Sequence, residues 1–408
     1  MKRFILVVLD GFGIGAMNDT PRVRPQDTGA NTCLHLLEKM PELSLPYLER
    51  LGLMNALGQE AGRLRYSPRA TFGRSDLAHY WADTFAGHQE IMGSTPRKPV
   101  EMPFSQYIRA VGDLLRSSGY KVEFRGKELK LLLVNGAITV ADNIEADLGL
   151  IYNVTGALDQ APFAEVLAVG RLVRSVVPVS RVIALGGEGI STADLLGALE
   201  EKDGKFIGVN CPRSGVYRQG YRVIHMGYGT DPERQVPTLL GRCGIQVTLL
   251  GKVADIVENP YGTSRSCVDT AAVLDLTLTR LRAVREGFIA TNVQETDLAG
   301  HAENAEAYAG KLVIADEYLG KIMAELADDD VLLVMADHGN DPTIGHSHHT
   351  REKVPLLACG PKVPPGYFGH RATLSDVGAT VAEYFGCPAP ENGKSFLNLL
   401  TGNTGNNP

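Results

Sequence analysis

The sequence predicts an α/β fold with a mainly parallel sheet between helices and a second domain inserted into it. Short apolar runs alternate with longer segments whose apolar residues recur at helical spacing. Residues typical of metal ligands lie on both sides of a middle segment that carries no such cluster. A chain of 408 residues is also long enough for two cores.

The expected strands are the apolar runs 4–9, 131–134, 247–251, 287–293, 331–336 and 354–360. Helical spacing predicts helices within 305–327 and 375–386. We expect a core from residues 1–95 and 225–402, an inserted α/β cap domain from 96–224, and a disordered polar tail at 403–408.

Composition excludes several classes of protein. The net charge is −7 and no run of Lys or Arg stands out, so we expect no nucleic-acid partner. No apolar stretch reaches about 18 residues, which argues against a membrane span. Asp10 ends the first apolar run and no cleavage motif follows, so a buried strand is favoured over a signal peptide. Six scattered cysteines are typical of reduced thiols, and we expect a cytoplasmic protein.

Acidic residues follow three of the predicted strands. Asp10 follows the first, Asp297 and His301 follow 287–293, and Asp337 and His338 follow 331–336. The carboxyl ends of parallel strands face one crevice, where like carboxylates repel unless a cation binds. Histidines beside them favour Mn²⁺ or Zn²⁺ over Ca²⁺. Taken one at a time, Asp10 could cap a loop and His301 could be a surface histidine; together they predict a two-metal site suited to phosphoryl transfer.

The nucleophile is expected in "WADTFAGHQEIMG", residues 81–93, which offers Asp83, Thr84 and His88. A metal-bound hydroxyl loses its proton readily and needs no strong general base. The alternative is a helix N-cap at Asp83 or Thr84, with His88 one turn later. Both interpretations are compatible, since helix N-termini also bind phosphate.

Four segments together resemble the phosphopentomutases of the alkaline phosphatase superfamily: "VVLDGFGIGA", "DTFAGHQEIMG", "GKVADI" and "ADHGNDPTIGHSHHTREKVPLL". The resemblance implies an alkaline-phosphatase-like core with a cap. It implies two divalent ions, usually Mn²⁺, with Mg²⁺ or Zn²⁺ as alternatives. It implies transfer of phosphate between C1 and C5 of ribose or deoxyribose through a phosphothreonine.

The resemblance also implies roles for single residues. Thr84 would carry the phosphoryl group and join Asp10, Asp337 and His338 around one metal. Asp297, His301 and His349 would hold the other metal. The candidate substrate-binding residues are Lys252, His88, Asp142, Arg213 and Arg218; arginine suits phosphate because its fork binds two oxygens.

Several positions depart from the family pattern. "WADT" replaces the usual "GKDT", and Asp297 and His301 stand four apart, as in cofactor-independent phosphoglycerate mutases. These departures predict a divergent paralogue acting on a phosphopentose or a related sugar phosphate. The competing hypotheses are a phosphatase or phosphodiesterase with the same site, and a non-catalytic metal-binding relative. A large cap with arginines favours a mutase, which must hold its intermediate away from water.

The expected partners are a small sugar phosphate and a sugar bisphosphate activator, in a monomer or small homo-oligomer. In the histidine-rich loop 336–349, His349 is the expected ligand, whereas His346 and His348 match no ligand of the family. Asp341 is expected to shape the turn before Pro342.

Overall fold

A computed structural model describes residues 1–145 and 148–402, and it forms two compact units. Unit 1 contains Met1–Pro96 and the chain from Asp231 onward, and unit 2 contains Arg97–Thr230. The second boundary lies later than residue 225 because β10 (Gln219–Gly227) pairs with β7 (Arg181–Glu188) of unit 2. The predicted disordered tail, 403–408, lies outside the described residues.

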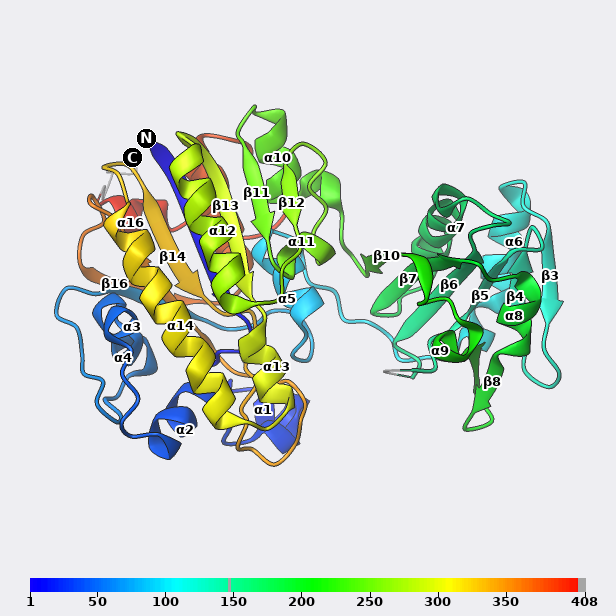
Figure 1. Cartoon of the computed structure of the whole chain (residues 1–408), viewed down its shortest axis with the longest axis horizontal. Coiled ribbons are helices and arrows are strands. Elements are labelled where there is room, and N and C mark those ends of the chain that lie inside the picture. Colours follow the sequence, from blue (N-terminus) through cyan, green and yellow to red (C-terminus); the bar gives the residue numbers. More distant parts are fainter. Residues whose placement is uncertain (146–147, 403–408) are drawn as a thin grey trace. The chain divides into compact units, whose positions relative to one another are not determined.

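The sheet of unit 1 has the strand order β12-β11-β13-β1-β14-β15-β2-β16 (Figure 1). Five of its seven neighbouring pairs are parallel, and the two pairs that involve β15 with β14 and β2 are antiparallel. The predicted α/β fold with a mainly parallel sheet is therefore confirmed. In chain order the strands are β1 (Lys2–Leu9), β2 (Thr71–Ser75), β11 (Val247–Leu250), β12 (Thr263–Arg265), β13 (Glu286–Val293), β14 (Val331–Met335), β15 (Val354–Cys359) and β16 (Gly366–Arg371).

Helices cover this sheet, and α12 packs on β13 and against α14 (Figure 1). Elsewhere in the unit, α15 packs against α10 and α5. The helices of unit 1 are α1 (Thr20–Val23), α2 (Thr32–Lys39), α3 (Pro46–Leu51), α4 (Leu53–Leu57), α5 (Thr84–Ile91), α10 (Val236–Arg242), α11 (Val253–Ile256), α12 (Thr270–Ala283), α13 (Glu295–His301), α14 (Ala305–Ala324), α15 (Ser375–Phe385) and α16 (Leu397–Thr401), with 3-10 turns at Pro25–Asp27 and Pro232–Arg234.

The core of unit 1 lies on both faces of the central strands. Residues 3–9 of β1 are all buried, as expected for a strand between two parallel neighbours with helices on each face. Each fully buried Leu, Ile, Val or Phe side chain contributes about 1.5–3 kcal/mol through burial. This rigid apolar centre fixes the positions of the strand ends, where the polar residues begin.

Unit 2 has its own six-stranded sheet in the order β10-β7-β6-β5-β4-β3, of which only the β6–β7 pair is parallel. Helices α6 (Ile108–Ser117) and α7 (Phe163–Val176) pack with it around a separate apolar core. The remaining elements are β3 (Val122–Arg125), β4 (Leu131–Val134), β5 (Ile138–Asp142), β6 (Ile151–Ala157), a β8 (Leu199–Lys202) and β9 (Phe206–Val209) hairpin, α8 (Thr192–Gly197), α9 (Cys211–Ser214) and a 3-10 turn at Phe104–Gln106. Among the described residues, no helix is both long and apolar enough to cross a membrane.

Candidate metal and phosphoryl-transfer site

The strand ends of unit 1 bring the predicted acidic residues together. Strand β1 lies between β13 and β14 and is parallel to both. Asp10 directly follows β1, Asp337 and His338 follow β14, and α13 starts after β13 and carries Asp297. These carboxylates therefore meet at the carboxyl ends of the central strands, as expected for parallel strands.

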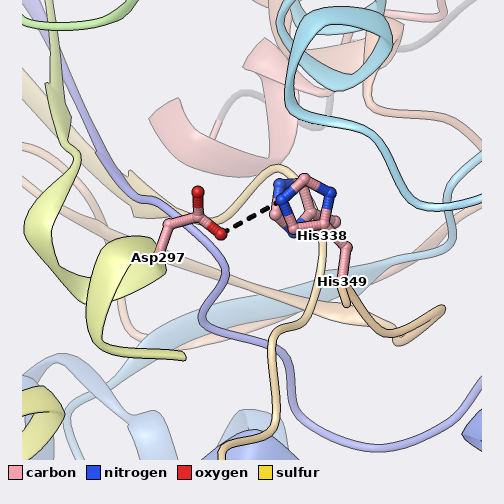
Figure 2. Close-up of side chains that lie close together, drawn as sticks. All are labelled: Asp297, His338 and His349. Atoms are coloured by element: carbon pink, nitrogen blue, oxygen red, sulfur yellow. Dashed lines mark ion pairs between the residues drawn. The ribbon is translucent and has the colours of Figure 1, made fainter. Parts of the chain in front are cut away.

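Two groups of side chains in this cluster have the spacing of metal ligands. Asp10, Asp337 and His338 form one group, and Asp297, His338 and His349 form the other (Figure 2). Within each group the ligand atoms lie within 4.8 Å of one another. His338 belongs to both groups. The Asp297 carboxylate also lies 3.4 Å from Nε2 of His301, which extends the second group.

Backbone carbonyls orient the three imidazoles in the same way. Nδ1 of His338 lies 2.9 Å from the Gly339 carbonyl, Nδ1 of His349 lies 3.0 Å from that of Ala82, and Nδ1 of His301 lies 2.7 Å from that of Ser347. A hydrogen bond from Nδ1 fixes the tautomer in which Nε2 is free to bind a metal. The buried Nε2 of His349 and Oδ2 of Asp337 make no well-aligned hydrogen bond within the described residues, although Oδ1 of Asp297 and Nδ1 of His88 lie 3.2 Å from them. Buried polar atoms that are poorly satisfied are costly, so these residues fit a bound cation.

Thr84 lies at the centre of the cluster, in the first turn of α5. Its Oγ1 is 2.7 Å from Nε2 of His338, 3.1 Å from Nζ of Lys252 and 3.4 Å from Oδ1 of Asp10. Asp83 is the N-cap and accepts a hydrogen bond from the Ala86 N–H at 2.8 Å. The cap and the inward hydroxyl coexist, as the sequence suggested, because they belong to adjacent residues.

Small residues allow α5 and the loop after β1 to approach the cluster. A Cβ on Gly87 would lie 2.9 Å from the Asp337 carbonyl oxygen, so only glycine lets α5 approach so closely. Gly11 has a φ of +75°, and its N–H donates to Oδ1 of Asp337 at 3.2 Å. The "LDG" of the first motif thus combines a candidate ligand with the turn that holds its neighbour.

The cluster holds more carboxylates than its lysine can neutralise. Burial, followed by the charge of Asp337, raises the pKa of Asp10 to about 7. Burial also acts to raise the pKa of Asp297, but hydrogen bonds with His301 and His349 outweigh it and the pKa falls well below its usual value. For Lys252, burial opposes the charged form, yet the Asp10 and Asp297 carboxylates raise its pKa. A carboxyl whose pKa is raised by burial and by a neighbouring carboxylate indicates a site that would gain from a further cation.

His88 lies elsewhere than the sequence suggested. Its side chain is completely buried, with Nδ1 2.9 Å from the Thr84 carbonyl and 3.2 Å from Oδ2 of Asp337. Nε2 lies 3.1 Å from the amide of Asn292, which also donates to Oδ2 of Asp10 at 3.1 Å. Both ring nitrogens are therefore occupied beneath Thr84. These contacts suit a role in which His88 orients Thr84, Asp337 and Asn292, whereas binding of substrate by His88 stays a prediction.

Two asparagines outside the predicted set of site residues support the carboxylates. Asn292, near the end of β13, holds Asp10, and Asn340 donates to Oδ1 of Asp297 at 2.8 Å. Both side chains are fully buried. The sequence did contain a signal for Asn292, which is an amide within the apolar strand "GFIATNV". A buried amide needs a polar partner, so it indicates a polar group nearby.

The remaining residues of the histidine-rich loop contact its surroundings. Asp341 accepts hydrogen bonds from the Thr343 N–H at 2.9 Å and from the Asn31 N–H at 3.0 Å, so it shapes a turn and ties the loop to the start of α2. Nε2 of His346 lies 3.2 Å from Oδ1 of Asp27. His348 is exposed. None of these three residues belongs to either metal-type group of the described residues.

The three substrate-binding candidates of unit 2 have different surroundings. The Arg213 side chain is exposed and donates to the carbonyls of Gly197 and Leu199, and Arg218 is exposed. Asp142 is fully buried, and its two oxygens accept hydrogen bonds from the N–H groups of Phe104 at 2.8 Å and Ile207 at 3.0 Å. Burial raises the pKa of Asp142 to about 6. These contacts suit a structural role within unit 2, and the sugar contact stays a prediction.

We predict that Asp142→Asn lowers the free energy of unfolding by about 1–3 kcal/mol, because the amide offers one acceptor oxygen where two buried N–H groups need one each. Urea unfolding measures the change, with the exposed Asp113→Asn as control. Wild-type stability combined with a raised KM for substrate would instead favour a direct sugar contact.

Comparison with known proteins places these residues in a family context. A model of the metalloenzyme superfamily matches residues 2–389. The chain is 31% identical over 406 residues to a phosphopentomutase of Desulfitobacterium hafniense, covering 98% of this chain and 100% of that protein. It is 32% identical over 430 residues to a phosphopentomutase of Hahella chejuensis, covering 97% and 99%. A solved phosphoglycerate mutase of Leishmania mexicana is 14% identical with a TM-score of 0.49, covering 97% of each chain.

Proposed function

Because the chain belongs to the phosphopentomutase family of the metalloenzyme superfamily, and is thus a metal-dependent phosphomutase, we propose that it interconverts the 1- and 5-phosphates of ribose or deoxyribose, or of a related sugar, through a phosphothreonine at Thr84. The observation that carries this proposal is the position of the Thr84 hydroxyl. It lies within 3.5 Å of His338, Lys252 and Asp10, at the N-terminus of α5.

Two divalent ions are proposed as cofactors, with Mn²⁺ ahead of Mg²⁺ and Zn²⁺ because the donors mix carboxylate oxygen with imidazole nitrogen. Asp10, Asp337, His338 and Thr84 would hold one ion, and Asp297, His301 and His349 the other. His338 lies close enough to serve either group. When bound, the ions supply positive charge that lowers the pKa of the threonine hydroxyl and neutralises the transferring phosphoryl group.

The proposed reaction has two transfers. In the first, a free sugar hydroxyl attacks the phosphorus of phosphorylated Thr84; the bond to Thr84 Oγ1 breaks and the sugar becomes a bisphosphate. In the second, Oγ1 attacks the other phosphate of that bisphosphate; the bond from its phosphorus to the sugar oxygen breaks, and that oxygen takes up the proton that the attacking hydroxyl gave up in the first transfer. This step restores the phosphothreonine and releases the isomer. A bisphosphate of the same sugar would phosphorylate an unmodified enzyme in the same way and so act as an activator.

The residues around Thr84 have distinct tasks in this scheme. The Lys252 ammonium lies 3.1 Å from Oγ1 and is positioned to bind a phosphoryl oxygen during both transfers. His88 and Asn292 hold Asp337, Asp10 and the Thr84 backbone in place, so the acceptor geometry exists before the substrate arrives. Arg213 and Arg218 are proposed to bind a phosphate of the substrate, for which the arginine fork is suited.

A panel of sugar phosphates, scored separately for isomer and for inorganic phosphate, tests the proposal. We expect ribose 1-phosphate or deoxyribose 1-phosphate to give the 5-phosphate with little free phosphate. Free phosphate as the main product from every compound would favour the alternative, a phosphatase or phosphodiesterase with the same residues.

A further inference from the structure

Arg351 is the most heavily hydrogen-bonded buried side chain near the site, yet it touches none of the reacting groups. Its residue is 4% exposed, and all five N–H donors of its guanidinium are used. Nε and Nη2 bind the two oxygens of Asp19 at 2.9 and 3.0 Å. The other donors bind the carbonyls of Leu77, His79 and Trp81 at 3.1, 2.9 and 2.6 Å.

These three carbonyls belong to the irregular segment that leads to Thr84. Within it, Trp81 has a φ of +72°, in the left-handed region that side chains other than Gly and Asn rarely adopt. Such a conformation persists only where the surroundings enforce it. The shortest of the guanidinium contacts is to the carbonyl of this same residue, Trp81.

The next carbonyl along the chain, that of Ala82, lies 3.0 Å from Nδ1 of His349. Arg351 and His349 are two residues apart, so neighbouring side chains hold the consecutive carbonyls of Trp81 and Ala82. If Trp81 relaxed to a negative φ, the Ala82 carbonyl would turn away from the imidazole. The same rotation would change the direction in which the chain enters Asp83 and Thr84.

We propose that Arg351 is a positioning residue: it holds Trp81 in its left-handed conformation, and thereby places the Ala82 carbonyl that orients His349 and the start of the helix that carries Thr84. This inference rests on the proposed function for its effect on turnover. Its effect on metal binding follows from the geometry of His349. Outer partners that orient metal-binding histidines typically change metal affinity or activity by about 10–100-fold.

The test compares Arg351→Lys with a matched control, Arg3→Lys. Arg3 is 3% exposed, pairs with Asp330 and donates to the carbonyls of Leu281 and Glu325, but it lies near the start of β1, at the opposite end of the strand from Asp10. Both variants should lower the thermal midpoint. Only Arg351→Lys should also weaken Mn²⁺ binding to the apo protein at one of two sites, by about tenfold or more, and lower kcat at saturating Mn²⁺.

Mn²⁺ affinity is measured by titration of the apo protein, followed by the electron paramagnetic resonance of free Mn²⁺, which is independent of turnover. If Arg351→Lys does not fold, the same measurements are made on Asp19→Asn. This variant weakens the hold on the Arg351 guanidinium, and its changed side chain is 30% exposed, so the fold should tolerate it. Two Mn²⁺ sites of wild-type affinity and an unchanged kcat in the folded variant would overturn the inference. A wild-type enzyme that binds Mn²⁺ but isomerises no sugar phosphate would instead contradict the proposed function, and the affinity ratio would still decide the role of Arg351.

Discussion

Replacing Thr84 with alanine is expected to reduce phosphoryl transfer by at least about 10³-fold, because the phosphoryl group loses its carrier while the charges around it stay in place. The variant should still bind close to two divalent ions, since the carboxylates and imidazoles of the cluster are unchanged. Initial rates of isomer formation and metal analysis of the purified variant measure the two quantities.

Thr380→Ala is a suitable control for the Thr84 variant. Thr380 is also a fully buried threonine, but its hydroxyl bonds to the Asp376 carbonyl within α15, away from the cluster. The Thr380→Ala variant should be less stable than the wild type, but the folded variant should keep its phosphoryl-transfer activity. Full activity of the Thr84 variant would rule out the covalent mechanism.

Replacing His338 with alanine should have the second largest effect, because His338 is the one residue shared by both metal-type groups of the described residues. Its Nε2 lies 3.5 Å from Oδ1 of Asp10, 3.4 Å from Oδ2 of Asp337 and 2.7 Å from Oγ1 of Thr84. We expect activity to fall by at least about 100-fold and both ions to bind more weakly. This loss would be larger than the usual effect of mutating a residue that only hydrogen-bonds to a metal ligand.

The His348→Ala variant provides the comparison, since His348 lies in the same loop but is exposed and outside both groups. It should bind two ions and turn over like the wild type. Chelation should inactivate wild type and control alike, and Mn²⁺ should restore both. A His338 variant that still holds two tightly bound ions would contradict the assignment of this residue.

Much of the central sheet could be predicted because its strands are continuous apolar runs. The six predicted strands and both predicted helices are present, with ends that differ by a few residues. Strands β2, β12 and β16 of this sheet were not predicted, because "TFGRS", "TSR" and "GYFGHR" are short and carry glycine or charged residues, as is common at or near a sheet edge. Their place in the sheet depends on pairing across the chain, which no local pattern reveals.

The candidate site was predictable to the extent that its residues stand at strand ends. Asp10, Asp337 and His338 meet because parallel neighbours end at one edge of the sheet. The direction of a side chain from a helix or loop is set by tertiary packing, so the spacing of His88 from Thr84 placed it near the site without showing that it is buried below it. Arg351 stood within a quoted motif, but its contacts lie more than 250 residues away in sequence.

The central claim is that the phosphoryl group moves between the sugar and Thr84 without reaching water. An experiment in isotopic water tests it most directly. The enzyme, loaded with Mn²⁺, is incubated with ribose 1-phosphate in ¹⁸O-labelled water, and the ribose 5-phosphate and inorganic phosphate are analysed by mass spectrometry. Direct transfer through Thr84 should give ribose 5-phosphate whose phosphate carries no label. Labelled inorganic phosphate as the main product would contradict it.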